Sequence, residues 1–259
     1  MRDSVAIIFS KNRPCQLDAL LRSIQHYAPE VFARIYVIYK SSVGFTATYE
    51  GYNILRGRCS DRVRFIQEVE LYRSFRSCLL LAFELAQDWN PSMVSFFSDD
   101  AILFRKVDPF FIPPGCLCHS LRLGKNLTYS YNANRPQREG ECDFLWKFSN
   151  DGHFYYFKGM QAAVAQGPIN KPGDLEDVFN AAPPLSGAVA YDTHSSLVCI
   201  QHNRVTTDAA NRNEGGNAED LNRRYVDDEE IDFLNMDFSS VNSPHMAIPY
   251  VFRKREKGR

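Results

Sequence analysis

The chain has 259 residues, of which 44% are hydrophobic and 24% are charged, and its formal net charge is −1. This length allows one large domain or one domain with a C-terminal extension, and the composition is that of an ordinary globular protein. A net charge so close to zero gives no support for a nucleic-acid-binding protein.

Hydrophobic residues form no run of membrane-spanning length, and the chain enters a strand-like pattern directly at Ser4. We therefore expect neither a transmembrane segment nor a signal peptide. The seven cysteines are odd in number and scattered, and the close pair Cys116 and Cys118 lacks the partners that a zinc site needs. Reduced thiols and a cytoplasmic location are the expectation.

The first 110 residues alternate between strand-like and helix-like patterns. Buried-strand patterns cover 5–9, 34–39 and 63–66, and apolar residues at helical spacing cover 17–24 and 71–86. A strand, a helix and a second strand within forty residues predict a βαβ unit and hence a parallel sheet. The pattern indicates an α/β fold, and this part of the chain resembles a nucleotide-binding half-domain.

The stretch 93–104 is the centre of the sequence. A strand-length apolar run reaches Ser98, is followed by Asp99 and Asp100, and then becomes apolar again. Such runs are typical of strands buried on both faces of a sheet, and ligands bind beyond the carboxyl ends of these strands. Adjacent carboxylates repel each other, and a bound divalent cation relieves the repulsion. Asp99 and Asp100 are therefore candidate metal ligands, with a solvated turn as the alternative.

No glycine-rich phosphate-binding loop occurs, because both the G-x-G-x-x-G pattern and the Walker pattern are absent from the sequence. A nucleotide site in this chain would therefore need a metal to hold a diphosphate.

The second half of the chain is less regular. Strand-like patterns cover 118–124 and 198–205, an aromatic-rich segment covers 143–148, and a turn at 151–152 leads into another strand. Residues 170–179 predict a turn followed by a short helix, with Asp174 as its N-cap. The acidic run 227–230 is expected on a solvated face, and the basic tail 253–259 is expected either to be disordered or to contact anionic lipid weakly.

Taken in order, these motifs resemble those of glycosyltransferases of the GT-A fold, in particular a group of bacterial and viral sugar transferases. The resemblance runs from residue 4 to residue 235 and is carried by 9–14, Phe97-Ser98-Asp99-Asp100 in place of a DxD motif, 151–154, 172–176 and 202–205. Two positions depart from the pattern. Ser98 replaces the first carboxylate, and Lys40-Ser41-Ser42 replaces an acidic end after the second strand, where the donor base and ribose would be recognised.

The resemblance implies a Rossmann-like, mainly parallel central sheet flanked by helices. It implies a GT-A domain over 1–235, with a nucleotide-binding half (1–110) and an acceptor and catalytic half (111–235), and a C-terminal extension over 236–259. The implied activity is transfer of a hexosyl or pentosyl group from a UDP- or GDP-sugar to a glycan or lipid-linked acceptor. Inversion at the sugar, Mn²⁺ or Mg²⁺ as cofactor and a role in polysaccharide biosynthesis are further implications.

The resemblance also assigns roles to residues. Asp100 is the implied direct metal ligand, Asp99 ligates directly or through water, and His202 is either a further ligand or a structural histidine. Glu176, then Asp151, then Asp177 are candidates for the base that deprotonates the acceptor, although acidic residues in a first helical turn also complement the helix dipole. Contacts to the donor are implied for Ser10, Asn12, Arg13, Arg73, Arg76 and Asp99, since guanidinium groups suit phosphate oxygens. Trp146 is a candidate platform for a sugar ring.

Two other functions stay open at this point. A sugar nucleotidyltransferase is built on a related sheet, but such enzymes usually have a glycine-rich basic loop after the first strand, and residues 10–14 contain no glycine. A non-catalytic nucleotide- or sugar-binding module would be consistent with the missing carboxylate at Ser98.

Overall fold

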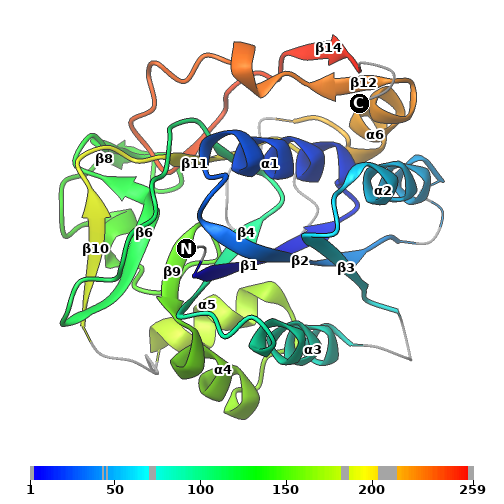
Figure 1. Ribbon diagram of the computed structural model, residues 1–259. Helices are drawn as coiled ribbons and strands as arrows, with labels where there is room; N and C mark the ends of the chain where they lie inside the picture. Colours follow the sequence, from blue (N-terminus) through cyan, green and yellow to red (C-terminus); the bar gives the residue numbers. More distant parts are fainter. Residues whose placement is uncertain are drawn as a thin grey trace.

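The computed structural model describes residues 3–42, 44, 46–69, 74–181, 187–203 and 215–255. Its centre is a seven-stranded sheet (Figure 1), with the order β10 (Ala188–Asp192), β6 (Cys116–Gly124), β9 (His153–Tyr156), β4 (Met93–Ser98), β1 (Ser4–Lys11), β2 (Phe32–Lys40) and β3 (Val63–Gln67). Strands β4, β1, β2 and β3 are parallel, and β9 is antiparallel to both β4 and β6. The predicted α/β class with a mainly parallel sheet is confirmed.

Smaller sheets adjoin the central one. One has three strands, β13 (His245–Met246), β11 (Leu197–Ile200) and β5 (Ala101–Leu103), and β5 continues the chain just after β4. Two further pairs are formed by β12 (Glu229–Ile231) with β14 (Phe252–Lys254) and by β7 (Tyr129–Ser130) with β8 (Arg135–Pro136). Strand β11 ends at Ile200, five residues earlier than the sequence pattern predicts.

Helices cover both faces of the central sheet, as Figure 1 shows. One face carries α1 (Pro14–Tyr27), α2 (Thr46–Arg58) and α6 (Ala218–Val226), and the other carries α3 (Phe75–Gln87), α4 (Phe157–Gln166) and α5 (Pro172–Ala181). Short 3-10 turns span Cys142–Leu145 and Phe233–Asn235. None of the helices in the described part of the chain has the length and apolarity needed to cross a bilayer. All seven cysteines are free.

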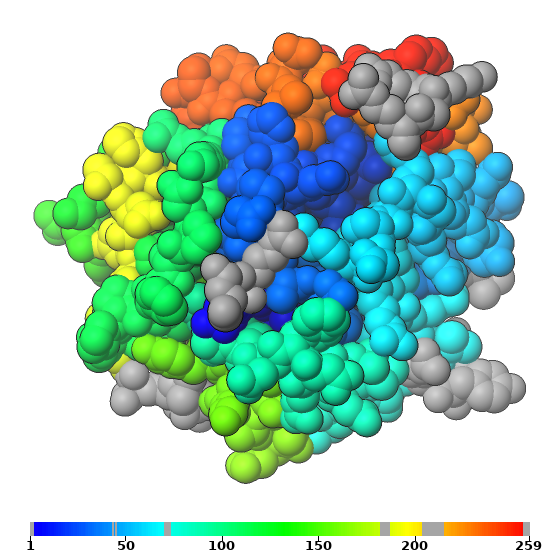
Figure 2. Space-filling model, viewed as in Figure 1, coloured from blue at the N-terminus to red at the C-terminus, as the bar shows by residue number. Residues whose placement is uncertain are grey.

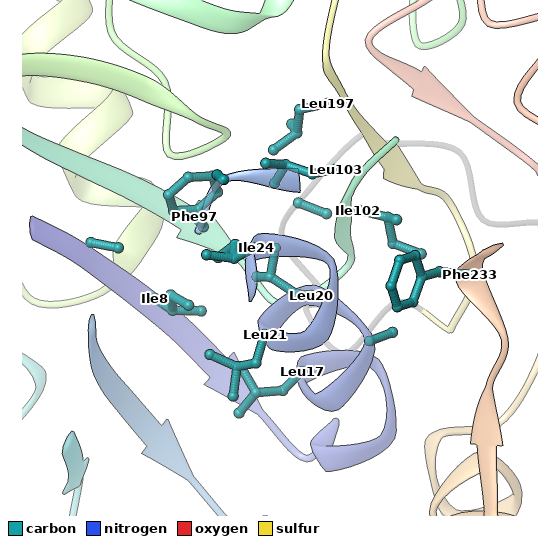
Figure 3. Close-up of a cluster of buried hydrophobic side chains, with 14 of the residues drawn as sticks. Ile8, Leu17, Leu20, Leu21, Ile24, Phe97, Ile102, Leu103, Leu197 and Phe233 are labelled. Atoms are coloured by element: carbon teal, nitrogen blue, oxygen red, sulfur yellow. The ribbon is translucent and has the colours of Figure 1, made fainter. Parts of the chain in front are cut away.

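Strand β1 lies between two hydrophobic clusters, because its side chains point alternately to the two faces of the sheet. Ala6 and Ile8 face α1, where Leu17, Leu20 and Ile24 pack onto them in the cluster of Figure 3. Val5, Ile7 and Phe9 face the opposite layer, formed by apolar side chains of α3, α4 and α5. This double burial explains why β1 and β4 read as continuous apolar runs.

Asn12 turns the chain from β1 into α1. Its φ of 58° lies in the left-handed region, which asparagine tolerates better than most residues, and its backbone N–H donates to the Lys40 carbonyl at 3.0 Å. Pro14 then begins the helix, where its missing N–H costs nothing. The turn leaves Arg13 between strand and helix, at the carboxyl end of the sheet.

Three helices were not predicted, namely α2, α4 and α6. Helix α6 is largely polar, and its start depends on Asn217, whose side chain accepts a hydrogen bond from the Glu219 N–H at 2.9 Å. Helix α5 was predicted, but Asp174 is not its N-cap. The helix begins at Pro172, and the Asp174 carboxylate reaches back to accept from the N–H groups of Asn170 and Lys171 at 2.7 and 3.1 Å.

The acidic run 227–230 is not uniformly solvated. Glu230 is only 3% exposed, and its carboxylate pairs with Arg58 at 2.9 Å and with Arg253 at 2.9 Å. The expectation of a solvated face is therefore wrong for Glu230, because this carboxylate joins α2 to the β12–β14 pair.

Residues 236–255 pack on the same core as the rest of the chain. Met236, Val241 and Ile248 belong to the cluster that α1 covers, and Figure 2 shows the C-terminal residues in orange and red beside α1 in blue. The domain boundary at residue 235 stays a prediction.

Gly152 supports a testable prediction about the turn before β9. Its φ is 74°, and an added Cβ would lie 3.1 Å from the Leu197 side chain, so alanine is disfavoured by both strain and space. We expect Gly152→Ala to lower the free energy of unfolding by about 1–2 kcal/mol, measured by urea denaturation. Gly173→Ala is the control, because Gly173 lies in α5 with open space around it and should gain about 0.5–1 kcal/mol. Equal effects of the two substitutions would contradict this reading.

Candidate active site

The carboxylate pair lies at the carboxyl end of the central strand β4. The backbone N–H of Asp99 donates to the Phe9 carbonyl at 3.1 Å, so the pair begins where β4 leaves β1. Asp99 is 4% exposed, and its Oδ2 accepts from the Lys11 N–H at 3.2 Å. The side chain of Asp100 is 18% exposed. The pair thus lies at the end of a strand, where the sequence analysis placed it. Asp100 is the more accessible of the two residues.

Arg13 bridges the pair. Its Nη1 donates to Oδ1 of Asp99 at 2.8 Å and to Oδ2 of Asp100 at 3.1 Å, while its Nε donates to the Asn203 carbonyl at 3.0 Å. The guanidinium is 8% exposed. One buried positive charge therefore compensates two carboxylates, and the loop after β1 is fixed to the loop after β4.

Burial shapes the protonation of both aspartates. Burial raises the pKa of Asp99, and the charge of Arg13 opposes this only in part. Burial also raises the pKa of Asp100 to about 6, again opposed by Arg13 and reinforced by the negative charges of Asp99 and Asp151. A cation bound at the pair would oppose this rise, because positive charge favours the ionised form of a carboxyl group.

Other charged and titratable side chains surround Asp151, which lies in the turn before β9. Its Oδ2 accepts from Arg122 Nη1 at 3.0 Å and lies 3.5 Å from Nε2 of His245. Burial alone would raise the pKa of Asp151, but the contacts with His245 and Arg122 outweigh it and hold this pKa well below its usual range. Asp151 is therefore an ionised carboxylate with little basicity.

Glu176 lies in the first turns of α5, next to the Asp151 turn. Its Oε1 accepts from the Asn150 N–H at 2.9 Å and from the Ser149 hydroxyl at 3.3 Å. Burial, together with the negative charge of Asp151, raises the pKa of Glu176. A carboxylate with a raised pKa is better suited to accept a proton near neutral pH than one with a depressed pKa.

The Asp99–Asp100 pair and the charged residues around Asp151 are linked electrostatically, because Asp151 influences the pKa of both Asp100 and Glu176. Among the described residues of the two groups, the carboxylates, which include Asp99, Asp100, Asp151 and Glu176, outnumber the guanidinium groups of Arg13 and Arg122. A bound cation would offset part of this excess of negative charge.

The donor set fits such a cation at Asp100. Carboxylate oxygens are the ligands that Mg²⁺ and Mn²⁺ prefer, and Asp100 is accessible. Both oxygens of Asp99 already accept hydrogen bonds, so Asp99 mainly holds Arg13. His202 has an unpartnered, buried Nε2, and its ring packs 5.3 Å from Tyr250. In the described part of the chain, however, the possible ligand atoms of Asp99, Asp100 and His202 do not all lie within 4.8 Å of one another.

Other predicted site residues have structural partners. The Ser10 hydroxyl pairs with the Tyr52 hydroxyl at 2.7 Å, and the Asn12 side chain bonds both the hydroxyl and the N–H of Ser42. Arg76 donates to the Ala165 carbonyl at 2.8 Å and to the Gly167 carbonyl, which caps the end of α4. Asp177 is exposed, and Arg73 lies outside the described residues.

Trp146 is 45% exposed and lines a depression in the surface. This depression has a volume of about 330 Å³ and is lined by Leu145, Trp146, Lys147 and Asn180. Asn180 donates to the Glu176 carbonyl at 2.9 Å, so the depression lies one helical turn from Glu176.

Arg122 and His245 were missed by sequence reasoning. Arg122 lies inside the strand-like segment 118–124, and its charge is the one local signal that could have singled it out. His245 follows Pro244 in an irregular segment, and the parallel pairing of β13 with β11, with His245 opposite Cys199, brings it to the site.

No protein-family model matches the sequence, and no curated protein sequence matches it either.

The structure is similar to solved glycosyltransferases at low sequence identity. Galactosyltransferase LgtC, solved with donor and acceptor sugar analogues, is 10% identical, with a TM-score of 0.42 over 73% of this chain and 72% of that chain. Glucosyl-3-phosphoglycerate synthase from Mycobacterium tuberculosis, solved with Mn²⁺, UDP and phosphoglyceric acid, is 11% identical, with a TM-score of 0.44 over 76% of this chain and 70% of that chain. Mannosyltransferase PcManGT from Pyrobaculum calidifontis, solved with GDP-Man and Mn²⁺, is 14% identical, with a TM-score of 0.46 over 80% of this chain and 58% of that chain. Likeness this distant assigns no function to the chain.

The Arg13 bridge leads to a prediction about stability. Arg13→Met should leave two carboxylates without their cation, and loss of one partner from a buried ion pair costs about 3–5 kcal/mol. Adding Asp99→Asn removes the most buried of these charges, so the double variant should be more stable than Arg13→Met alone. Urea denaturation of the four proteins in this cycle measures the coupling, and strictly additive losses would argue against the bridge.

Proposed function

We propose that the chain is a metal-dependent glycosyltransferase that moves a sugar from a nucleoside diphosphate sugar to a glycan or lipid-linked acceptor, with inversion. The observation that carries the proposal is the partly exposed carboxylate of Asp100 at the end of β4, within a cluster that has more carboxylates than guanidinium groups. The ordered motifs of the sequence add support. The proposal includes a UDP- or GDP-sugar as donor, a hexosyl or pentosyl group, and polysaccharide synthesis in the cytoplasm.

The donor would bind at the carboxyl ends of β1 and β4. Asp100 would hold Mn²⁺ or Mg²⁺, with Asp99 ligating through water and His202 available as a further ligand. A cation bound there supplies positive charge for the departing nucleoside diphosphate. Arg13 keeps the two aspartates in place and limits their repulsion, while Ser10 and Asn12 shape the loop after β1 through their bonds to Tyr52 and Ser42.

The acceptor would bind on the Glu176 side of the cluster. Glu176 takes the proton from the acceptor hydroxyl, the acceptor oxygen forms a bond to the anomeric carbon, and the bond from that carbon to the diphosphate oxygen breaks. Asp151 stays ionised, and its negative charge stabilises the positive charge that develops on the sugar in the transition state. The exposed indole of Trp146 would pack against an acceptor sugar ring.

The first test of this function is release of a nucleoside diphosphate from a panel of UDP- and GDP-sugars, with and without Mn²⁺. Asp100→Ala should abolish metal-dependent release and leave the melting temperature of the metal-free protein nearly unchanged. Asp108→Ala is the matched control, because Asp108 is a carboxylate whose side chain is 73% exposed. Full turnover in the presence of a chelator would overturn the metal-dependent reading.

The same panel separates the alternatives. A sugar nucleotidyltransferase would instead consume a sugar phosphate and a nucleoside triphosphate and release pyrophosphate. A binding module would show a ligand-induced rise in melting temperature without release of any product.

The identity of the base is tested by two adjacent acids. Glu176→Gln should lower kcat by about 10²–10⁴-fold, whereas Asp177→Asn should keep most of the activity, since Asp177 is exposed. A base must be deprotonated, so wild-type activity should fall as pH decreases through the raised pKa of Glu176. Glu176→Gln should lose the part of this acidic limb that belongs to Glu176 and keep the part that comes from protonation of Asp100, whose pKa is raised to about 6. A larger loss in Asp177→Asn would reverse the assignment.

A further inference from the structure

Three side chains of metal-ligating types lie together beside the candidate active site, and of these only Asp151 has a role in the reaction proposed above. Asp151 precedes β9, Cys199 lies in β11 and His245 lies in β13, and one ligand atom from each falls within 4.8 Å of the other two. All three residues are buried, at 8%, 1% and 7% exposure. Within the described residues this is the one such set of three.

The position of Cys199 and His245 follows from strand pairing. Cys199 lies opposite His245 in the parallel β11–β13 pair and opposite Ala101 in the antiparallel β11–β5 pair. The turn at Gly152, fixed by its N–H to the Phe96 carbonyl at 2.8 Å, brings Asp151 to the same place. Three separate segments are therefore fixed around one point by backbone hydrogen bonds.

The ring of His245 lies between two carboxylates. Nε2 lies 3.5 Å from Oδ2 of Asp151, and Nδ1 lies 3.9 Å from Oδ1 of the buried Asp143. Neither Nδ1 of His245 nor Oδ2 of Asp143 has a hydrogen-bond partner in the structure. A carboxylate behind one ring nitrogen orients the ring so that the other nitrogen can bind a metal.

We propose that Asp151, Cys199 and His245 form a second cation site, with mixed oxygen, sulfur and nitrogen ligands, that selects Zn²⁺ over Mn²⁺ and Mg²⁺. The selectivity follows from donor chemistry, because thiolate and imidazole favour Zn²⁺ whereas the oxygen-only pair at Asp99 and Asp100 favours harder cations. Three protein ligands leave a fourth position for water.

The charges around this site balance when it is filled. Asp151, Asp143 and a Cys199 thiolate carry three negative charges, while Zn²⁺ and the Arg122 guanidinium carry three positive charges. Binding releases the thiol proton of Cys199 to solvent, and His245 binds as the neutral imidazole. Without a cation, the positive charge of Arg122 acts on both Asp143 and Asp151.

Co²⁺ is the probe for this site, because a thiolate bound to Co²⁺ gives an intense charge-transfer absorption in the near ultraviolet. Titration of the metal-free chain with Co²⁺ should produce this band at one equivalent, and added Zn²⁺ should remove it. Cys199→Ala should lose the band. Cys78→Ala is the matched control, since Cys78 is also a fully buried cysteine but packs in the cluster on the other face of the sheet, and it should keep the band.

Asp143→Asn tests the outer carboxylate. It should keep the band and weaken Co²⁺ binding by about 10–100-fold, the usual effect of losing such a partner. Circular dichroism of the metal-free variants shows whether each has folded. Folded wild-type protein without a charge-transfer band, or a band that survives in Cys199→Ala, overturns the proposal. Because the readout is spectroscopic, a failed nucleotide-sugar assay leaves this result intact, and the reverse also holds.

Discussion

The candidate site depends on one interaction, the buried contact of the Arg13 guanidinium with Asp99 and Asp100. It joins the loop after the first strand to the loop after the central strand, and its Nε extends the connection to Asn203 beyond β11. Two like charges next to each other in a buried place would push the loops apart. One guanidinium between them holds the edge of the sheet together and still leaves the pair with a deficit of positive charge.

The division of labour among the carboxylates follows from their partners. Asp151 accepts a hydrogen bond from Arg122 and lies beside His245, and its pKa is depressed, whereas burial raises the pKa values of Asp99, Asp100 and Glu176. Residues of the same chemical type thus have different capacities, because Asp151 stays ionised while a carboxyl group with a raised pKa can exchange a proton nearer neutral pH.

Local patterns were sufficient for the part of the fold that contains repeated apolar spacing. The strands β1, β2, β3 and β4 and the helices α1 and α3 were predicted because both faces of the sheet are buried, and the carboxylate pair stood out because an apolar run stops at Ser98. Helices α2 and α6 were missed, since their sequences are too polar to show a clear period. The contacts of Arg13 with Asp99 and of Asp151 with His245 join distant segments, and no local pattern encodes the partner of a buried charge.

The pairing of β13 with β11 places His245, a residue near the end of the described chain, next to Asp151 in the middle of it. During synthesis, every strand of the central sheet, the last of which ends at Asp192, is made before the strand that carries His245. The surroundings of Asp151 are completed only when the strand with His245 has emerged and docked. A nascent chain that has not yet reached His245 would therefore have the strands of the central sheet without the finished charge cluster.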